Sequence, residues 1–179
     1  MALDKRQFID SLLEAYESFF DIKRDIEKDN ISLAAEAIFH SRSEKYVLVK
    51  SAKLWAVETN EYAYFIDKET SSLEEFKNLR EKVLEMGMKE IKPHSEHMYS
   101  YITMVYIANN IGDDIKKDIE QYKCHKMFLF SLHGWMYFRL AAVDLSKKTI
   151  ITNKRGGELR DILQKVMQRV VYIEREADL

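Results

Sequence analysis

Residues 98–108 read MYSYITMVYIA, and this stretch decides the fold. Its aromatic and β-branched side chains occupy both odd and even positions, whereas a strand with one face in solvent alternates apolar and polar residues. The stretch therefore predicts a central strand that is covered on both faces. Pro93 precedes this strand, and Asn109-Asn110 ends it.

The segments after this strand alternate between helix and strand. Residues 112–122 carry apolar side chains at helical spacing, which predicts a short helix. Residues 127–132 and 135–145 are predicted as two parts of one strand with a kink at His133-Gly134. A hairpin turn at 146–148, a return strand at 149–152 and a last helix after Gly156-Gly157 follow.

The segments before the central strand begin with an amphipathic helix over 5–20, for which Asp4 is the expected N-cap. The charged stretch 21–30 is a connector or an exposed first strand, and residues 31–39 alternate as a strand does. The remaining predictions are a turn at 41–44, one long strand from Tyr46 to Val57 with a kink at Ser51, a tight turn at 59–61, a strand at 62–66, and a helix at 72–86 with Gly87 as its C′ residue.

About six mostly sequential strands and about four helices indicate an α+β fold. We expect a single globular domain over residues 1–179, in which an antiparallel sheet is backed by helices on one face. The only two tryptophans, Trp55 and Trp135, each follow a polar or glycine-containing kink in a long strand. An internal βββα duplication, with pseudo-repeats at 31–88 and 99–171, is one explanation; chance similarity is the other.

The composition excludes several classes of protein. With 179 residues, 46% of them hydrophobic, and only 5 glycines and 1 proline, the chain is neither disordered nor collagen-like. The single Cys124 excludes an internal disulfide framework, and the net charge of −2 disfavours nucleic acid as a partner. Because the N-terminus lacks the apolar core of a signal peptide and no apolar run approaches membrane-spanning length, we expect a cytoplasmic protein with no membrane association.

A basic loop at 152–158 is the first candidate for chemistry. Asn153, Lys154 and Arg155 precede two glycines and a helix, so the loop offers positive charge, close backbone approach and unpaired amides. Such a loop can bind a phosphate or a carboxylate, although it matches no nucleotide-binding consensus. The alternative is a solvated turn whose glycines relieve strain.

Histidines supply the second candidate. His94 and His97 flank the start of the central strand, and His133 lies just before Trp135. Together with Glu96 and His125 they could form a metal-dependent hydrolase, because imidazoles and carboxylates are zinc ligands. The usual zinc spacings are absent, and the alternative is that the imidazoles bond to backbone.

The chain contains the motifs KPHSEHMYSY at 92–101, HGW at 133–135, VDL at 143–145 and TNKRG at 152–156. They resemble motifs of a family of uncharacterised bacterial proteins, a domain of unknown function. The resemblance implies a small bacterial cytoplasmic domain and carries no activity. Our hypothesis is a binding module for a small anionic ligand or a protein partner, with no cofactor, in which the loops bearing His94, His97, His133, Trp135, Asn153, Lys154 and Arg155 meet at one rim of the sheet. Whether the protein is an enzyme is left open.

Overall fold

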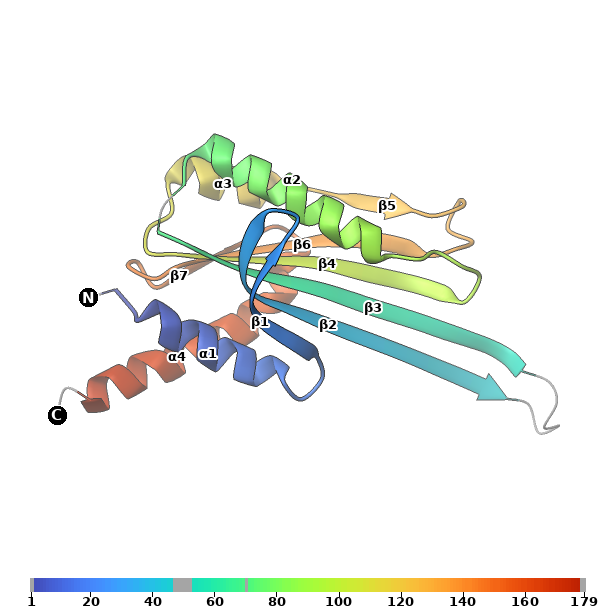
Figure 1. Cartoon of the computed structure of the whole chain (residues 1–179), viewed down its shortest axis with the longest axis horizontal. Coiled ribbons are helices and arrows are strands. Elements are labelled where there is room, and N and C mark those ends of the chain that lie inside the picture. The colour runs from blue at the N-terminus through green and yellow to red at the C-terminus, as the bar shows by residue number, and fades with distance from the viewer. Residues whose placement is uncertain (1, 47–52, 70, 178–179) are drawn as a thin grey trace.

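One seven-stranded sheet organises the protein (Figure 1). The computed structural model describes residues 2–46, 53–69 and 71–177, and the side chains of all of these except those within 44–56. The strand order is β1-β2-β3-β4-β6-β5, and β7 pairs with β6. The elements are α1 (Lys5–Tyr16), β1 (Asp21–Lys28), β2 (Ile31–Tyr46), β3 (Lys53–Lys68), α2 (Leu73–Glu90), β4 (His97–Ala108), α3 (Asp113–Gln121), β5 (His125–Met127), β6 (Trp135–Asp144), β7 (Thr149–Thr152), the 3₁₀ helix η1 (Gly156–Leu159) and α4 (Arg160–Ala177).

The sheet is mixed, so the expectation of an antiparallel sheet was wrong. β1, β2 and β3 pair antiparallel, and so do β6 with β5 and with β7. β4 instead runs parallel to both β3 and β6. The reason is that α2 and α3 lie in the connections on either side of β4, and a helical crossover returns the chain to the same end of the sheet.

Helices cover both faces of the sheet, which corrects the prediction that they lie on one face. Phe76 and Val83 of α2 and Ile115 of α3 pack on one face, while Phe8 of α1 and Leu163 of α4 pack on the other (Figure 1). The side chains of β4 alternate between these two cores. The prediction that 98–108 forms a central strand covered on both faces is therefore confirmed.

Several predicted boundaries were also confirmed. Asp4 caps α1 by accepting a hydrogen bond from the amide of Gln7 at 2.6 Å, and residues 21–28 form an exposed strand. The short helix after Asn110, the strand from Trp135, the return strand and the last helix are present.

Other predicted boundaries were wrong. Residues 41–44 and 59–61 are not turns but parts of β2 and β3. Residues 41–44 pair with β3, and residues 59–61 pair with both β2 and β4, so that Asn60 lies opposite both His40 and Ser100. The strand predicted at 127–132 stops at Met127, because a turn with three consecutive left-handed residues, at 129–131, follows it. The single strand predicted from Tyr46 to Val57 was wrong, because Tyr46 ends β2 and pairs antiparallel with Lys53 of β3. The kink predicted at Ser51 lies outside the described residues.

Gly87 is an interior residue of α2 rather than its C′ residue. A β-carbon at this position would lie 2.6 Å from the side chain of Ile102 in β4. The glycine therefore allows α2 to approach the sheet closely and to continue to Glu90.

The internal duplication stays unconfirmed. The described part of 31–88 holds two long antiparallel strands and α2, whereas 99–171 holds most of β4, α3, three further strands, η1 and much of α4. Among the helices that the structure describes, none combines the length and the apolar character needed to cross a membrane.

Candidate functional site

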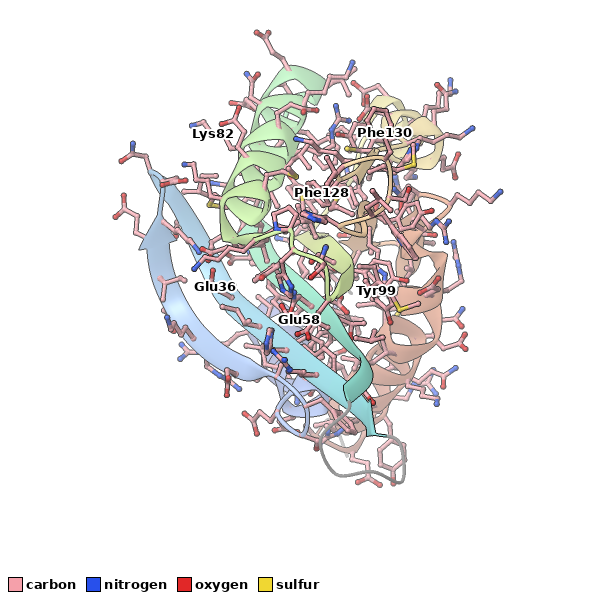
Figure 2. The ribbon with its side chains drawn as sticks, turned by 90° about the vertical axis from the view of Figure 1, so that its right-hand side faces the viewer. Glu36, Glu58, Lys82, Tyr99, Phe128 and Phe130 are labelled. Carbon is pink, nitrogen blue, oxygen red and sulfur yellow. The ribbon has the colours of Figure 1, made fainter. Side chains whose placement is uncertain are left out.

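Two of the three predicted loops meet at one end of the sheet, the end that faces the viewer in Figure 2. Tyr99 of β4 lies opposite Trp135 of β6, which brings the segment at 94–97 beside the turn at 133–134. The Nδ1 atom of His97 lies 2.8 Å from the carbonyl oxygen of His133. The sequence-based expectation that these segments converge is confirmed for this pair.

His97 connects the segment at 94–97 to the turn at 133–134 through a hydrogen bond. Because a carbonyl only accepts, Nδ1 carries the proton and donates to His133, and Nε2 accepts from the hydroxyl of Ser100 at 2.8 Å. A serine bonded to a histidine can be an activated nucleophile. Ser100, however, has no exposed surface, so no substrate reaches its hydroxyl in this structure.

His94 belongs to a separate polar cluster around Glu58 of β3. The Nε2 atom of His94 lies 3.1 Å from the carboxylate of Glu58, and the Nε2 atom of His40 lies 4.0 Å from it. The amide of Asn60 donates to Glu58 at 3.2 Å and its oxygen bonds to His40. Partial burial acts to raise the pKa of the Glu58 carboxyl, but the Asn60 hydrogen bond and the charges of His94 and His40 outweigh it and hold this pKa below its usual value.

The lowered pKa of Glu58 predicts a pH-dependent contribution to stability. A carboxyl whose pKa is lower in the folded than in the unfolded chain stabilises the fold above its unfolded value, near pH 4.3, and loses this contribution as the pH falls through the folded pKa. We expect Glu58→Gln to lower the free energy of unfolding at pH 5 and to lose most of this effect by pH 3. Urea unfolding of both proteins across this range measures it. An equal difference at pH 5 and pH 3 would contradict the assignment.

Trp135 lies in a row of aromatic side chains on the sheet face that α1 and α4 partly cover. Its ring stacks on Tyr99 with centroids 6.2 Å apart, and the row continues through Tyr101 to Tyr137. Arg155 ends the row, because its guanidinium carbon lies 3.9 Å from the centroid of the Tyr137 ring. His97 packs instead on Phe128, on the α2 and α3 face. The predicted site residues are therefore divided between the two faces.

The third predicted loop lies further along β6 and does not join His94, His97 and His133. Asn153 bonds to Phe138 and Leu140, which are three to five residues beyond Trp135, or about 10 to 17 Å along the strand. Its side-chain oxygen accepts the amides of Leu140 at 3.1 Å and Gly156 at 2.6 Å, and its side-chain nitrogen donates to the carbonyls of Phe138 and Tyr122. The single shared rim expected from the sequence is thus correct for two loops and wrong for the third.

Asn153 also changes how the basic loop can bind an anion. The amides of both glycines are used, since Gly156 donates to the Asn153 side chain and Gly157 donates to the Asn153 carbonyl at 3.2 Å. The expectation of unpaired amides in this loop is therefore wrong for Gly156 and Gly157. Lys154 and Arg155 are exposed. Their side chains, rather than the two glycine amides, are therefore the groups of this loop that can bind an anion.

A pocket of about 130 Å³ opens beside this loop, at the edge of β6 between β5 and β7. Its basic side chains are Lys123, His125, Lys154 and Arg155, and none of its lining residues is acidic. Tyr122, Cys124, Tyr137, Phe138 and Asn153 form the rest of the wall. Burial raises the pKa of the Cys124 thiol, so this wall residue is uncharged at neutral pH.

Sequence reasoning missed the segment 122–125 as part of this pocket. Its signal was present, because Lys123 and His125 follow the predicted helix directly and flank the lone cysteine. The missing information was the pairing of β5 with β6, which places this segment opposite the basic loop.

The histidines do not form a metal centre in the part of the chain that the structure describes. Within residues 2–46, 53–69 and 71–177, no three His, Cys, Asp or Glu side chains are grouped to hold a metal ion. Both ring nitrogens of His97 bond to the protein, and Glu96 pairs with Arg42 at 2.7 Å. Nothing in this geometry favours the hydrolase alternative.

The fold is that of an α+β protein built on one mixed sheet, with helices on both faces. The chain belongs to the family described as Domain of unknown function (DUF8052), whose model matches residues 4–165. This match confirms the resemblance to a family of uncharacterised proteins. No curated protein matches the chain, and no solved structure matches it.

Proposed function

We propose that the protein is a binding module for a small anion, which it holds in the pocket formed by 122–125, Tyr137 and the 153–155 loop. One observation carries this proposal: four basic side chains and no carboxylate line a pocket of about 130 Å³. An unbalanced positive rim around a partly apolar wall favours an anion, because hydrogen bonds from charged donors are about twice as strong as neutral ones. The volume suits phosphate or a short carboxylate.

The positions of the two key side chains support this assignment. Arg155 is held by its contact with the Tyr137 ring, so it loses less rotational freedom on binding than an unrestrained side chain does. Asn153 fixes the loop that carries both basic residues through its four hydrogen bonds. The neutral Cys124 thiol adds no opposing charge.

Titration of the full chain with inorganic phosphate, followed by amide chemical shifts, tests the proposal. We expect the shifts to change at 122–125 and 153–157, and we expect Lys154→Ala and Arg155→Ala each to weaken binding about tenfold. Lys165→Ala is the matched control, because this exposed lysine of α4 lies outside the pocket. Absence of saturable shifts in this segment, or equal binding by all four proteins, would overturn the proposal.

A protein partner is the second candidate, and a different feature favours it. The turn between β5 and β6 exposes Leu129, Phe130 and Leu132, with Phe130 94% exposed. Leu129 and Phe130 have left-handed backbone angles, which cost energy for residues other than glycine. Such exposed apolar clusters mark interaction surfaces. We expect Phe130→Ser, measured in the same titration, to leave phosphate binding unchanged, which separates the two candidates.

A further inference from the structure

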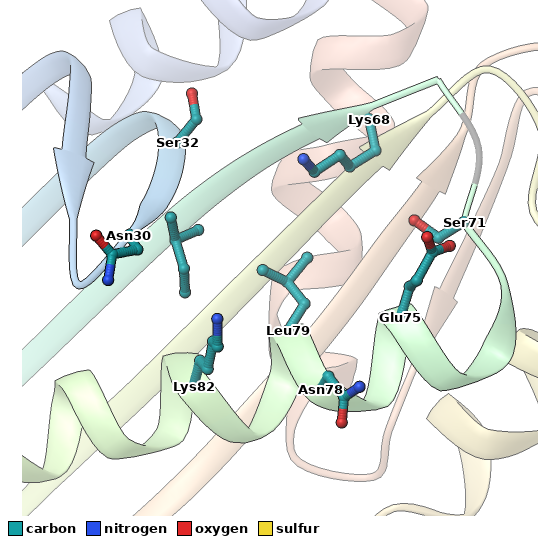
Figure 3. Close-up of a pocket in the computed structure, with 9 residues that line it drawn as sticks. Asn30, Ser32, Lys68, Ser71, Glu75, Asn78, Leu79 and Lys82 are labelled. Atoms are coloured by element: carbon teal, nitrogen blue, oxygen red, sulfur yellow. The ribbon is translucent and has the colours of Figure 1, made fainter.

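A second cavity, of about 360 Å³, lies between the turn joining β1 to β2, the end of β3 and the first half of α2 (Figure 3). It shares no lining residue with the basic pocket beside β6. Three separate elements contribute polar side chains to it, so the shape of the cavity depends on how these elements are held together.

Ion pairs fix the hairpin turn above α2. Asp29 accepts from Lys89 at 2.6 Å, and Lys28 donates to Glu90 at 2.7 Å and to Glu36 at 2.5 Å. Asp29 and Asn30 both have left-handed backbone angles, as the two central residues of a tight hairpin turn require. These contacts anchor the turn to the C-terminal half of α2, and the cavity lies beside the N-terminal half.

Two lysines supply the positive charge of this cavity. Figure 3 shows the side chains of Lys68, from the end of β3, and Lys82, from α2, extending into the space between the hairpin turn and the helix. Neither forms an ion pair or hydrogen bond with another described residue, unlike Lys77 and Lys89 of the same helix, which pair with Asp118 and Asp29. The charge of Lys68 also acts on the carboxylate of Glu75, which lines the same cavity. Two ammonium groups that border one cavity, neither within ion-pair distance of a described carboxylate, can donate charge-assisted hydrogen bonds to a phosphate group.

The other polar groups of the cavity suit hydroxyl groups. Asn30, Ser32 and Asn78 present amides and a hydroxyl that bond to no other described side chain. Glu75 lies beside Ser71 at the far end of the cavity in Figure 3, and it accepts both hydrogen bonds from Ser72 through Oε2, so that Oε1 is left for a ligand donor. Leu79 forms an apolar wall between the two ends.

We infer that this cavity binds a phosphate monoester of a sugar, with the phosphate at Lys68 and Lys82 and the hydroxyl groups toward Asn78 and Glu75. The lysines bind the dianion, the asparagine and the carboxylate bind hydroxyls, and Leu79 contacts the apolar face of the sugar ring. This site is separate from the phosphate pocket proposed above, and either assignment can fail without the other.

Titration of the full chain with glucose 6-phosphate, followed by amide chemical shifts, tests this inference. We expect saturable changes at 30–32, 68–71 and 75–82, and weaker binding of glucose and of inorganic phosphate at the same residues. Lys68→Ala and Lys82→Ala are each expected to weaken glucose 6-phosphate binding about tenfold. Asn78→Ala is expected to reduce the preference for glucose 6-phosphate over inorganic phosphate, because it removes a hydroxyl partner and leaves both lysines.

Lys154→Ala provides the matched control. It should leave the changes at 75–82 intact, whereas Lys82→Ala should leave the response of 122–125 to phosphate intact. The inference fails if glucose 6-phosphate perturbs no residue of the cavity. It also fails if inorganic phosphate binds there as tightly as the ester, or if Lys68→Ala and Lys82→Ala bind the ester as the wild type does.

Discussion

Replacing Asn153 with alanine is expected to lower the free energy of unfolding by about 4 kcal/mol. Asn153 is only 2% exposed, and its side chain bonds to two amides and two carbonyls. Two of these bonds are made to Phe138 and Leu140 of β6, which lie between the residues that pair with β5 and those that pair with β7. Alanine leaves the four backbone groups without these partners, and each buried group that stays unsatisfied costs about 1 to 3 kcal/mol.

Urea unfolding monitored by circular dichroism measures this loss. Asn78→Ala is the control, because Asn78 is exposed on α2 and bonds to no other described side chain, so we expect a change below about 0.5 kcal/mol. A loss below about 1 kcal/mol for Asn153→Ala would show that water or a backbone shift replaces its bonds. The same variant should also weaken phosphate binding, since Lys154 and Arg155 depend on this loop.

The central strand and most helices could be predicted because local pattern decides them. Residues 98–108 carry apolar side chains on both faces, and the structure places a helix layer over each. The direction of β4 relative to its neighbouring strands could not be predicted from its side-chain pattern. Parallel and antiparallel strands use the same side-chain alternation, and the direction here follows from the crossovers through α2 and α3.

Polar residues inside strands caused the main boundary errors. Asn60 favours turns when only its own propensity is considered. In the sheet, its amide bonds to Glu58 and to His40, so tertiary contacts satisfy the groups that a turn would otherwise satisfy. The same limit applies to the candidate site. The sequence suggests the basic loop, but only strand pairing shows that 122–125 completes the pocket and that His94, His97 and His133 lie elsewhere.

Replacing Gly134 with alanine is expected to lower the free energy of unfolding by about 3 kcal/mol. Gly134 has φ +76°, a left-handed conformation that costs alanine about 1 to 2 kcal/mol. The added β-carbon would also meet the carbonyl oxygens of Met98 and His97. These are backbone atoms, and β4 is held between β3 and β6, so the clash is relieved only by moving the turn that carries His133.

Gly157→Ala is the matched control for this prediction, because no atom lies within 4 Å of the added β-carbon and we expect a change within about 0.5 kcal/mol. Urea unfolding of both variants gives the comparison. The near-ultraviolet circular dichroism of Gly134→Ala should also change, since the turn positions Trp135 on Tyr99 and anchors the His97 hydrogen bond to His133. If both alanine variants are equally stable, the turn relaxes freely, and the junction between β4 and β6 is less rigid than these contacts indicate.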